Sequence, residues 1–492
     1  MQSTFVRQGT VIIGFVVFLS LFWSFHQAPA VSSPRPNIIV IMTDDQDARS
    51  FEEMPAAYRL GKTGTTFLNS FVTTSLCCPS RSTFLTGQYS HNHGVVTNDV
   101  PEGGYGKLDH TKTLAVWLQN AGYHTAMIGK YLNGYGSVDA NPLDGNDAAR
   151  EIPPGWNEWY AILGPAFFNY TMNENRTLVT YGNLPDEYST DVFARKAIDY
   201  VRRQAGQAQP FFLYLNFFAP HSGAPSTNGP EPAPRHKDRL RYLPTPKAPG
   251  FNELDVSDKP SFISGLPKFG DIPSKAWALH ERFRRRRESL MAVDEAVMGI
   301  EQILHATGQW DNTLIIFTSD NGFFQGEHRI KLGKVLPHEP SIRVPLLIRG
   351  PGVMAEQTRS ELVSNVDLAA TILEFAQAAP NLTQDGRSLA PLLENIPTPW
   401  RTSLLVEFRG SAPKLTGGED GVMALPFSGV RTDRYLYVEY QSGDREFYDL
   451  LGDPYQLQNL DASTDTNHVT LKDQLRQKLN SLRDCVGMGC FQ

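Results

Sequence analysis

Four short apolar runs, each followed at once by polar residues, constrain the fold of this chain more than any other feature. The runs are residues 37–43, 125–129, 211–219 and 314–319. Each has the length and continuous apolar character of a strand buried on both faces, as in parallel sheets covered by helices. Between them, residues 290–304 place apolar side chains at helical spacing. The pattern predicts an α/β fold.

The residues just past these strands are the candidate functional residues. The four runs end at Asp44-Asp45, Lys130, Pro220-His221 and Asp320-Asn321. Ligands of open α/β sheets bind outside the carboxyl ends of the strands. We therefore expect these residues to converge in one cleft.

Two of the strand ends carry the oxygen ligands of a hard cation. Asp44, Asp45, Asp320 and Asn321 have no neighbouring histidine or thiolate in sequence, which favours Ca²⁺ or Mg²⁺ over zinc. A single Asp-Asp pair is more often a turn or a helix cap. Two such pairs, each ending a buried strand, favour a metal site.

A second segment with chemical potential begins at Cys77. Pro79 fits the first turn of a helix, which places Cys77 at the positively polarised amino end, and Arg81 follows one turn later. Taken alone, Cys77-Cys78 would be two buried thiols or a vicinal disulfide. The longer pattern Cys-x-Pro-Ser-Arg favours a functional site.

Cys77-Cys78-Pro79-Ser80-Arg81, with Leu85-Thr86-Gly87, resembles the signature of the type I sulfatases, whose first cysteine is oxidised to Cα-formylglycine. The likeness covers nearly all of the exported chain and is greatest for the N-acetylglucosamine-6-sulfatase and arylsulfatase group. It rests on these further motifs: Asp44-Asp45-Gln46-Asp47, Gly129-Lys130-Tyr131-Leu132-Asn133, Ala219-Pro220-His221-Ser222, Ser319-Asp320-Asn321-Gly322, Asn365-Val366-Asp367-Leu368 and Glu446-Phe447-Tyr448-Asp449-Leu450. The resemblance implies an alkaline-phosphatase-like fold, with a large mixed sheet flanked by helices and a smaller C-terminal antiparallel β subdomain.

The resemblance also implies the chemistry. One Ca²⁺ would be bound by Asp44, Asp45, Asp320 and Asn321, with formylglycine 77 and a substrate sulfate oxygen. One hydroxyl of the aldehyde hydrate would attack sulfur, and deprotonation of the other would reform the aldehyde and release sulfate. The remaining catalytic residues would be Arg81 and Lys130, which polarise the hydrate and neutralise charge, and His221 and Lys334, which bind sulfate and protonate the leaving group.

One position departs from the family pattern. Many relatives have a histidine two residues after the lysine, where this chain has Leu132. The base that deprotonates the second hydroxyl is therefore open. His221 is the first choice, and the weaker options are His124, His91 and His93, of which His91 and His93 are expected to brace the loop after the cysteine-bearing helix.

The expected substrates are sulfated carbohydrates, such as N-acetylglucosamine 6-sulfate of glycosaminoglycans, or aryl sulfates. One alternative is a metal-dependent phosphatase or phosphodiesterase of the same fold, which would need a Thr or Ser nucleophile and a richer ligand set for two metals. Another is a non-catalytic glycan-binding protein with unconverted Cys77. The balance of 45 Lys and Arg against 52 Asp and Glu, a net charge of −7, argues against a nucleic-acid or anionic-membrane surface.

The amino terminus predicts export. Residues 11–25 are apolar, Arg7 precedes them, and Ala28-Pro29-Ala30 has the form of a signal-peptidase site. Residues 1–30 are thus a predicted signal peptide, a retained anchor being the lesser alternative, and the protein would be secreted, periplasmic or lysosome-like. Three sequons, at Asn169, Asn175 and Asn381, are compatible with export.

In such a compartment Cys485 and Cys490 are close enough to close a small loop, whereas Cys77 and Cys78 must stay unpaired. On the resemblance, a formylglycine-generating enzyme converts Cys77 as a free thiol during export.

Three further expectations concern organisation. A catalytic α/β domain would span residues 35–397 and a small subdomain residues 398–492, in which residues 434–440 alternate like a half-buried strand before a final helix. Residues 222–275, with ten prolines, predict a long irregular excursion. The Arg284–Arg287 run predicts a solvated, salt-bridged helix face.

Overall fold

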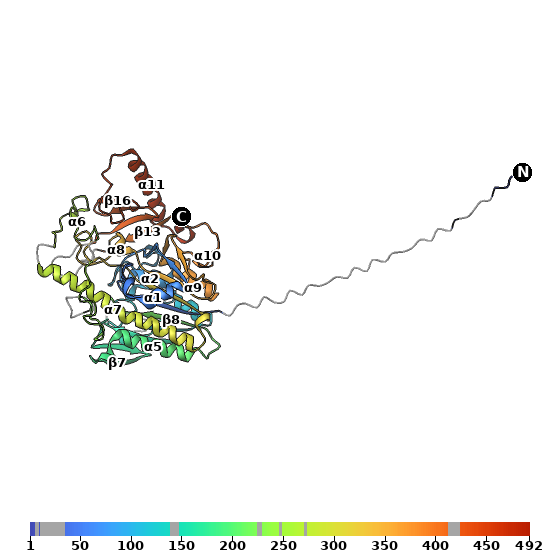
Figure 1. Ribbon diagram of the computed structural model, residues 1–492, viewed down its shortest axis with the longest axis horizontal. Helices are drawn as coiled ribbons and strands as arrows, with labels where there is room; N and C mark the ends of the chain where they lie inside the picture. Colours follow the sequence, from blue (N-terminus) through green and yellow to red (C-terminus); the bar gives the residue numbers. More distant parts are fainter. Residues whose placement is uncertain are drawn as a thin grey trace. The chain divides into compact units, whose positions relative to one another are not determined.

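The computed structural model describes residues 1–4, 9, 35–137, 147–223, 229–245, 248–269, 273–411 and 424–492. Residues 35–492 form one compact unit (Figure 1). The predicted signal peptide lies almost wholly outside the described residues. Within the described ranges, no helix combines the length and apolar character needed to cross a membrane.

The centre of the molecule is a ten-stranded mixed sheet with the order β11-β2-β10-β9-β1-β8-β4-β5-β6-β7. All four predicted strands are present as adjacent parallel neighbours: β9 (Thr313–Ser319), β1 (Asn37–Thr43), β8 (Phe211–Asn216) and β4 (His124–Gly129). Because they are parallel, their carboxyl ends meet at one edge, as expected. The flanking strands are β2 (Thr65–Phe67), β10 (Leu346–Arg349), β11 (Gln357–Arg359), β5 (Glu158–Leu163), β6 (Tyr170–Glu174) and β7 (Thr177–Tyr181).

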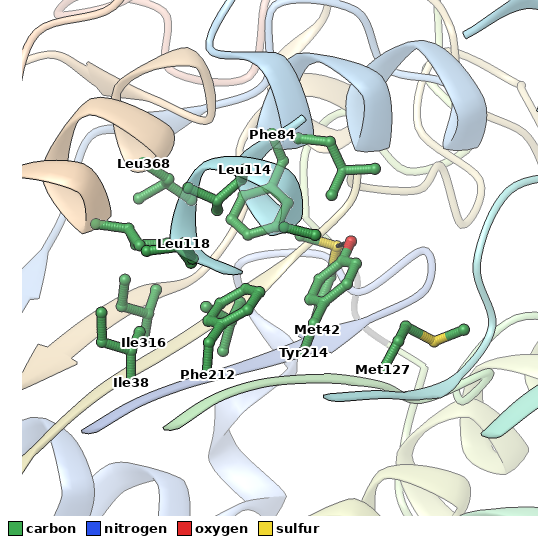
Figure 2. Close-up of a cluster of buried hydrophobic side chains, with 14 of the residues drawn as sticks. Ile38, Met42, Phe84, Leu114, Leu118, Met127, Phe212, Tyr214, Ile316 and Leu368 are labelled. Carbon is green, nitrogen blue, oxygen red and sulfur yellow. Dashed lines mark hydrogen bonds between the residues drawn. The ribbon is translucent and has the colours of Figure 1, made fainter. Parts of the chain in front are cut away.

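Helices cover both faces of this sheet, which explains why its central strands are apolar at every position. On one face Ile38 and Met42 of β1 and Phe212 and Tyr214 of β8 pack against α2 (Cys77–Thr86), α4 (Leu114–Asn120) and α9 (Val366–Ala376), as Figure 2 shows. On the other face lie α1 (Pro55–Lys62), α5 (Ser189–Gln204) and α7 (Pro273–Ala306), the last two visible beneath β8 in Figure 1. The expected α/β architecture is confirmed.

Helix α7 carries both a confirmed and a wrong prediction. Its predicted apolar face, residues 290–304, is buried against the sheet and α5. The basic run at its centre is salt-bridged as expected, since Arg284 pairs with Glu288 at 2.6 Å. It is not solvated, however, because Arg284, Arg286 and Arg287 are all at least 95% buried. Loops that follow the central strands pack over this part of the helix and accept its guanidinium donors.

A separate antiparallel sheet forms the C-terminal part of the chain, as predicted. Its strands are β13 (Ser403–Phe408), β14 (Phe427–Thr432), β15 (Tyr435–Tyr440) and β16 (Arg445–Asp449), in that order. The final helix α11 (Thr466–Leu482) covers one face. Strand β15 is buried on both sides and not half-buried, because the residues around α8 cover its other face. The boundary between residues 397 and 398 stays a prediction.

Short elements complete the described chain. Between residues 229 and 269 the one regular element within the described ranges is α6 (Ser261–Ser264), which agrees with an irregular excursion. The others are β3 (Ser70–Phe71), β12 (Val363–Ser364), α3 (Ser90–His93), α8 (Glu339–Ile342) and α10 (Ala390–Leu393).

A buried ion pair joins the segment before β13 to the main body. Arg401 contacts the Asp367 carboxylate, and both side chains are buried. Asp367 also accepts hydrogen bonds from the backbone of Ser364 and Arg387, each at 2.9 Å. We expect Arg401→Leu to lower the free energy of unfolding by about 3–5 kcal/mol, because it leaves a buried carboxylate without its counter-charge.

Urea denaturation measures this effect. Arg202→Leu, which breaks an exposed pair with Asp199, is the matched control and should cost less than about 1 kcal/mol. Equal destabilisation by both substitutions would show that the buried pair has no special role.

Candidate active site

Cys77 lies at the centre of a buried cluster at the carboxyl edge of the main sheet. It is the first residue of α2 and is 1% exposed. Its Sγ lies 3.5 Å from Lys130 Nζ, 2.8 Å from Lys334 Nζ and 3.7 Å from Asp44 Oδ1. The predicted convergence of Asp44 and Lys130 with the amino end of this helix is therefore observed.

Each of the two lysines is held by one aspartate. Lys130 Nζ donates to Asp44 Oδ2 and Lys334 Nζ donates to Asp45 Oδ1. Burial lowers the pKa of both lysines, but the carboxylates outweigh it and the net pKa is raised, so both side chains are cationic. Two fixed positive charges thus flank the Cys77 side chain.

The predicted acidic pairs lie together at the ends of β1 and β9. Asp45 donates its backbone N–H to Asp320 Oδ1 at 3.1 Å, and Asn321 Nδ2 donates to Asp45 Oδ1 at 2.7 Å. Burial alone would raise the pKa of Asp44, but the nearby cations, Lys130 foremost, lower it to about 2. Burial would also raise the pKa of Asp45, but the nearby cations, Lys334 foremost, lower it. Both carboxylates are ionised at neutral pH.

These residues fit a hard cation. Ligand atoms of Asp44, Asp45, Cys77 and His221 lie within 4.8 Å of one another. The Asn321 Oδ1 atom is buried and has no hydrogen-bond partner, so it is an oxygen available to a metal. The oxygens of Asp44, Asp45 and Asn321 suit Ca²⁺, and Cys77 and His221 lie beside them. His221, assigned from sequence to sulfate binding, also lies within reach of this group.

Arg81 connects several residues of the cluster. Its Nε donates to Asp320 Oδ2 at 2.8 Å, and its Nη1 donates to Asn216 Oδ1 at 3.0 Å. Its Nη2 lies 3.7 Å from Asp44 Oδ2. Asn216 was not predicted, although a polar side chain at the carboxyl end of a buried strand is a recognisable signal.

Arg286 is a second residue that sequence reasoning missed. Its Nη1 donates to the Pro220 carbonyl at 3.1 Å, and its Nη2 donates to the Asp45 carbonyl. The guanidinium lies over the Phe323 ring, 4.3 Å from its centroid. One buried side chain therefore joins the loop that carries Asp45 to the loop that carries His221.

The four candidate histidines separate clearly. His221 Nε2 lies 3.6 Å from Asp45 Oδ2, and 31% of its side chain is exposed, which places it where the cluster meets solvent. His124 was a wrong option, because it begins β4 and Lys130 follows the other end of that strand, about 20 Å away. His91 Nδ1 contacts Glu407 at 2.8 Å, and His93 Nε2 contacts Thr83 at 3.1 Å. These two contacts connect the segment after α2 to β13 and back to α2, as a bracing role requires.

The remaining cysteines also behave as expected. Cys485 and Cys490 form a disulfide, whereas Cys77 and Cys78 are free. Cys78 is buried away from the lysine pair, with its Sγ 3.0 Å from the backbone nitrogen of Asn133.

Comparison with known proteins agrees with this geometry. A family model described as Sulfatase matches residues 36–378, and another, described as N-sulphoglucosamine sulphohydrolase, C-terminal, matches residues 326–485. The human N-acetylglucosamine-6-sulfatase is 34% identical over 94% of this chain and 87% of its own length. The arylsulfatase of Volvox carteri is 32% identical over 96% of this chain and 78% of its own.

Solved structures share the fold. A protein determined with its substrate D-glucosamine-2-N,6-O-disulfate superposes with a TM-score of 0.72, at 24% identity, over 91% of this chain and 97% of that one. A phosphonate monoester hydrolase of Agrobacterium radiobacter gives 0.67, at 23% identity, over 91% and 95%. The chain belongs to the sulfatase family and is a sulfuric ester hydrolase with the alkaline-phosphatase-like fold.

Proposed function

We propose that this protein hydrolyses sulfate esters of sulfated sugars, such as N-acetylglucosamine 6-sulfate of glycosaminoglycans, or aryl sulfates. The names of its relatives support this substrate class. The active nucleophile would be formylglycine 77, made from Cys77 by a formylglycine-generating enzyme, with one Ca²⁺ as the metal. The apolar amino terminus supports export through a cleaved signal peptide. We also propose that a C-terminal subdomain begins at residue 398.

The observation that carries the proposal is the position of Cys77 between two lysines and beside Asp44. Burial raises the pKa of the Cys77 thiol to about 11, although Lys130 and Lys334 oppose the rise. A thiol that stays protonated at neutral pH is a poor nucleophile. A side chain converted to an aldehyde hydrate would instead offer two hydroxyls on one carbon, one to attack sulfur and one whose deprotonation allows release.

The surrounding residues suit the two stages of such a reaction. Lys130 and Lys334 place fixed positive charge where a sulfate ester would lie, and fixed charges of this kind stabilise negative charge that develops in a transition state. Arg81 holds Asp320 and the Lys130 backbone in place. Asp44, Asp45, Asp320 and Asn321 would hold the Ca²⁺, which when bound polarises the ester and neutralises its charge.

The residue types at the site argue against a phosphatase or a phosphonate hydrolase. Such enzymes would use a Thr or Ser nucleophile and more ligands for a second metal. Here position 77 is cysteine, and one group of metal-ligating side chains is found among the described residues. The similarity to phosphonate hydrolases is below 25% identity and shows the shared fold alone.

The decisive experiment combines peptide mass spectrometry with a substrate panel. Formylglycine at position 77 appears as a loss of about 18 Da relative to cysteine. We expect this species in active protein, with turnover of 6-sulfated glucosamine above that of aryl phosphates and phosphonates. If Cys77 were unmodified throughout an active preparation, the formylglycine mechanism would be wrong. If the modified protein did not turn over these sulfate esters, the proposed substrate class would be wrong.

Removal of the metal should inactivate the enzyme reversibly. We expect EGTA dialysis to lower kcat for an aryl sulfate by at least about 100-fold, since the ester loses its main electrophilic support. Addition of Ca²⁺ should restore activity, with one ion bound per chain by atomic emission. Full activity in metal-free protein would contradict the assignment of the acidic cluster.

His221 should impose an acidic limb on the pH profile. Burial lowers its pKa below the ordinary 6.5, although Asp45 and Asp44 oppose the shift. The imidazole is therefore neutral at pH 7 and able to accept a proton, and it becomes inactive as a base when pH falls through its lowered pKa. We expect His221→Gln to reduce kcat by about 10²–10⁴-fold and to abolish that limb; an unchanged limb would assign the base elsewhere.

A further inference from the structure

A basic surface stretch, residues 237–242, has no role in the site described above. Lys237, Arg239 and Arg241 are exposed. Within the described residues none of these three cations forms an ion pair with a carboxylate. The one acidic residue among them, Asp238, is 3.1 Å from Arg284 of α7, which also pairs with Glu281 and Glu288 at 2.6 Å each. With Asp238 counted, the stretch has three positive charges and one negative charge, a net excess of two.

This surplus is unusual for the molecule. Some exposed arginines have carboxylate partners, for example Arg202 with Asp199, and others such as Arg176 have none among the described residues, but here three cations without a carboxylate partner fall within five residues. The whole chain carries a net charge of −7, so the local excess does not follow from composition. Uncompensated cations on an acidic protein raise its folding cost through mutual repulsion and attract anions from solution.

The stretch is held in place by α7. Leu240 donates its backbone N–H to Glu288 Oε1 at 2.9 Å, and Thr245 Oγ1 lies 2.7 Å from His280 Nδ1. Together with the Asp238–Arg284 pair, these contacts fix the backbone that carries the cations. A ligand would not have to order this backbone on binding, which favours affinity.

Aromatic side chains adjoin the cations. Tyr242 is 87% exposed, with the Arg241 guanidinium 5.4 Å from its ring centroid. Trp277 is 57% exposed and precedes His280 by about one turn of α7. Exposed rings supply flat apolar area that packs against the C–H faces of sugar rings. Cations beside such a ring can bind an anionic carbohydrate, and the net charge of −7 of the whole chain argues against a nucleic-acid or anionic-membrane surface.

The same helix connects this stretch with the candidate active site. Arg286, two residues beyond Arg284, donates to the carbonyls of Asp45 and Pro220. The basic stretch contacts Arg284 and Glu288, and the catalytic loops contact Arg286, so both pack along the same segment of α7 on different faces of the helix.

We infer that residues 237–242 form a second binding site, outside the catalytic cluster, for a sulfated polysaccharide chain. The inference rests on the proposed function for its choice of polyanion, and it specifies that the substrate is a polymer and not a free monosaccharide. Each contact with a densely charged chain releases counterions, so binding should weaken steeply as salt rises.

The test compares a triple variant, Lys237→Gln/Arg239→Gln/Arg241→Gln, with the unaltered chain, both carrying Cys77→Ala for the binding measurements. Affinity for a sulfated dodecasaccharide is measured by calorimetry at three salt concentrations. We expect about tenfold weaker binding at low salt, since each exposed charge contact is worth a few-fold. The slope of log K against log salt should become shallower by about 2.

The matched control removes three other exposed cations, Arg202, Arg476 and Lys112, by the same substitutions. It should bind the dodecasaccharide like the unaltered chain. In the form with Cys77 present, the stretch variant should keep full turnover of a small aryl sulfate while kcat/KM on the polymer falls about tenfold.

Equal binding by the stretch variant and the unaltered chain would overturn the inference, and so would an equal loss in the control. The inference would also be overturned if the triple substitution weakened binding to phosphatidylserine vesicles or single-stranded DNA more than it weakened binding to the sulfated chain. Failure of the proposed function would appear separately, as absence of aryl sulfate turnover in the unaltered protein.

Discussion

Replacement of Cys77 by alanine is expected to abolish sulfate-ester hydrolysis, with kcat reduced by at least about 10⁴-fold. The residue lies between Lys130 and Lys334 at the amino end of α2, and no other nucleophilic side chain occupies that position among the described residues. Turnover of an aryl sulfate by purified protein measures the effect. The folded state is checked by thermal denaturation, because loss of one buried thiol should cost little stability.

Cys78→Ala is the matched control, since the two thiols are adjacent in sequence and equally buried. The Cys78 thiol accepts from the backbone nitrogen of Asn133 and does not touch the lysine pair. We expect its substitution to leave at least about a tenth of the activity, the loss reflecting a small cavity. Equal inactivation of two folded variants would contradict the choice of nucleophile.

The second large effect should come from Arg286→Met, which preserves apolar volume but removes the guanidinium. Its two charge-assisted hydrogen bonds hold the carbonyls of Asp45 and Pro220, and bonds of this kind contribute about 1.5–3 kcal/mol each. Loss of both should misplace the metal-binding and histidine loops, and kcat/KM should fall by about 10²–10³-fold. The apparent affinity for Ca²⁺, measured by titration into metal-free protein, should fall as well.

Arg285→Met offers a control within the same basic run. Arg285 is partly exposed and pairs with Glu281 on its own helix at 2.8 Å. We expect near-normal kinetics and unchanged Ca²⁺ affinity in this variant. If Arg286→Met were destabilised but bound Ca²⁺ and substrate normally, its guanidinium would be a purely structural element and the positioning role would be wrong.

Much of the fold and of the site could be predicted because it is local. A strand buried on both faces leaves an unbroken apolar run, and the first polar residues after it identify the edge where ligands bind. Asp44, Lys130 and Asp320 were found in this way and do lie together. The Cys77 helix start followed from Pro79, and the small C-terminal disulfide followed from the spacing of its cysteines.

What could not be predicted depends on contacts between distant segments. The burial of Arg286 requires two loops from separate strands to fold over α7, and neither loop is near it in sequence. His124 is a different case, because it begins the strand that Lys130 follows, and the rule that ligands bind past the carboxyl ends of strands already places it at the opposite edge. The double burial of β15 likewise depends on α11 and the region around α8, which no alternation within the strand reveals.

The burial of Cys77 also sets an order of events in time. The side chain is 1% exposed and is enclosed by segments as far along the chain as Lys334. A modifying enzyme needs the thiol in an accessible, extended segment, so on the proposed function conversion must occur before Lys334 docks. Protein that folds first would be trapped as an inactive thiol form, and later exposure to the modifying enzyme would not rescue it without unfolding. The fraction of active molecules would then depend on the rate of Cys77 conversion relative to the rate of folding.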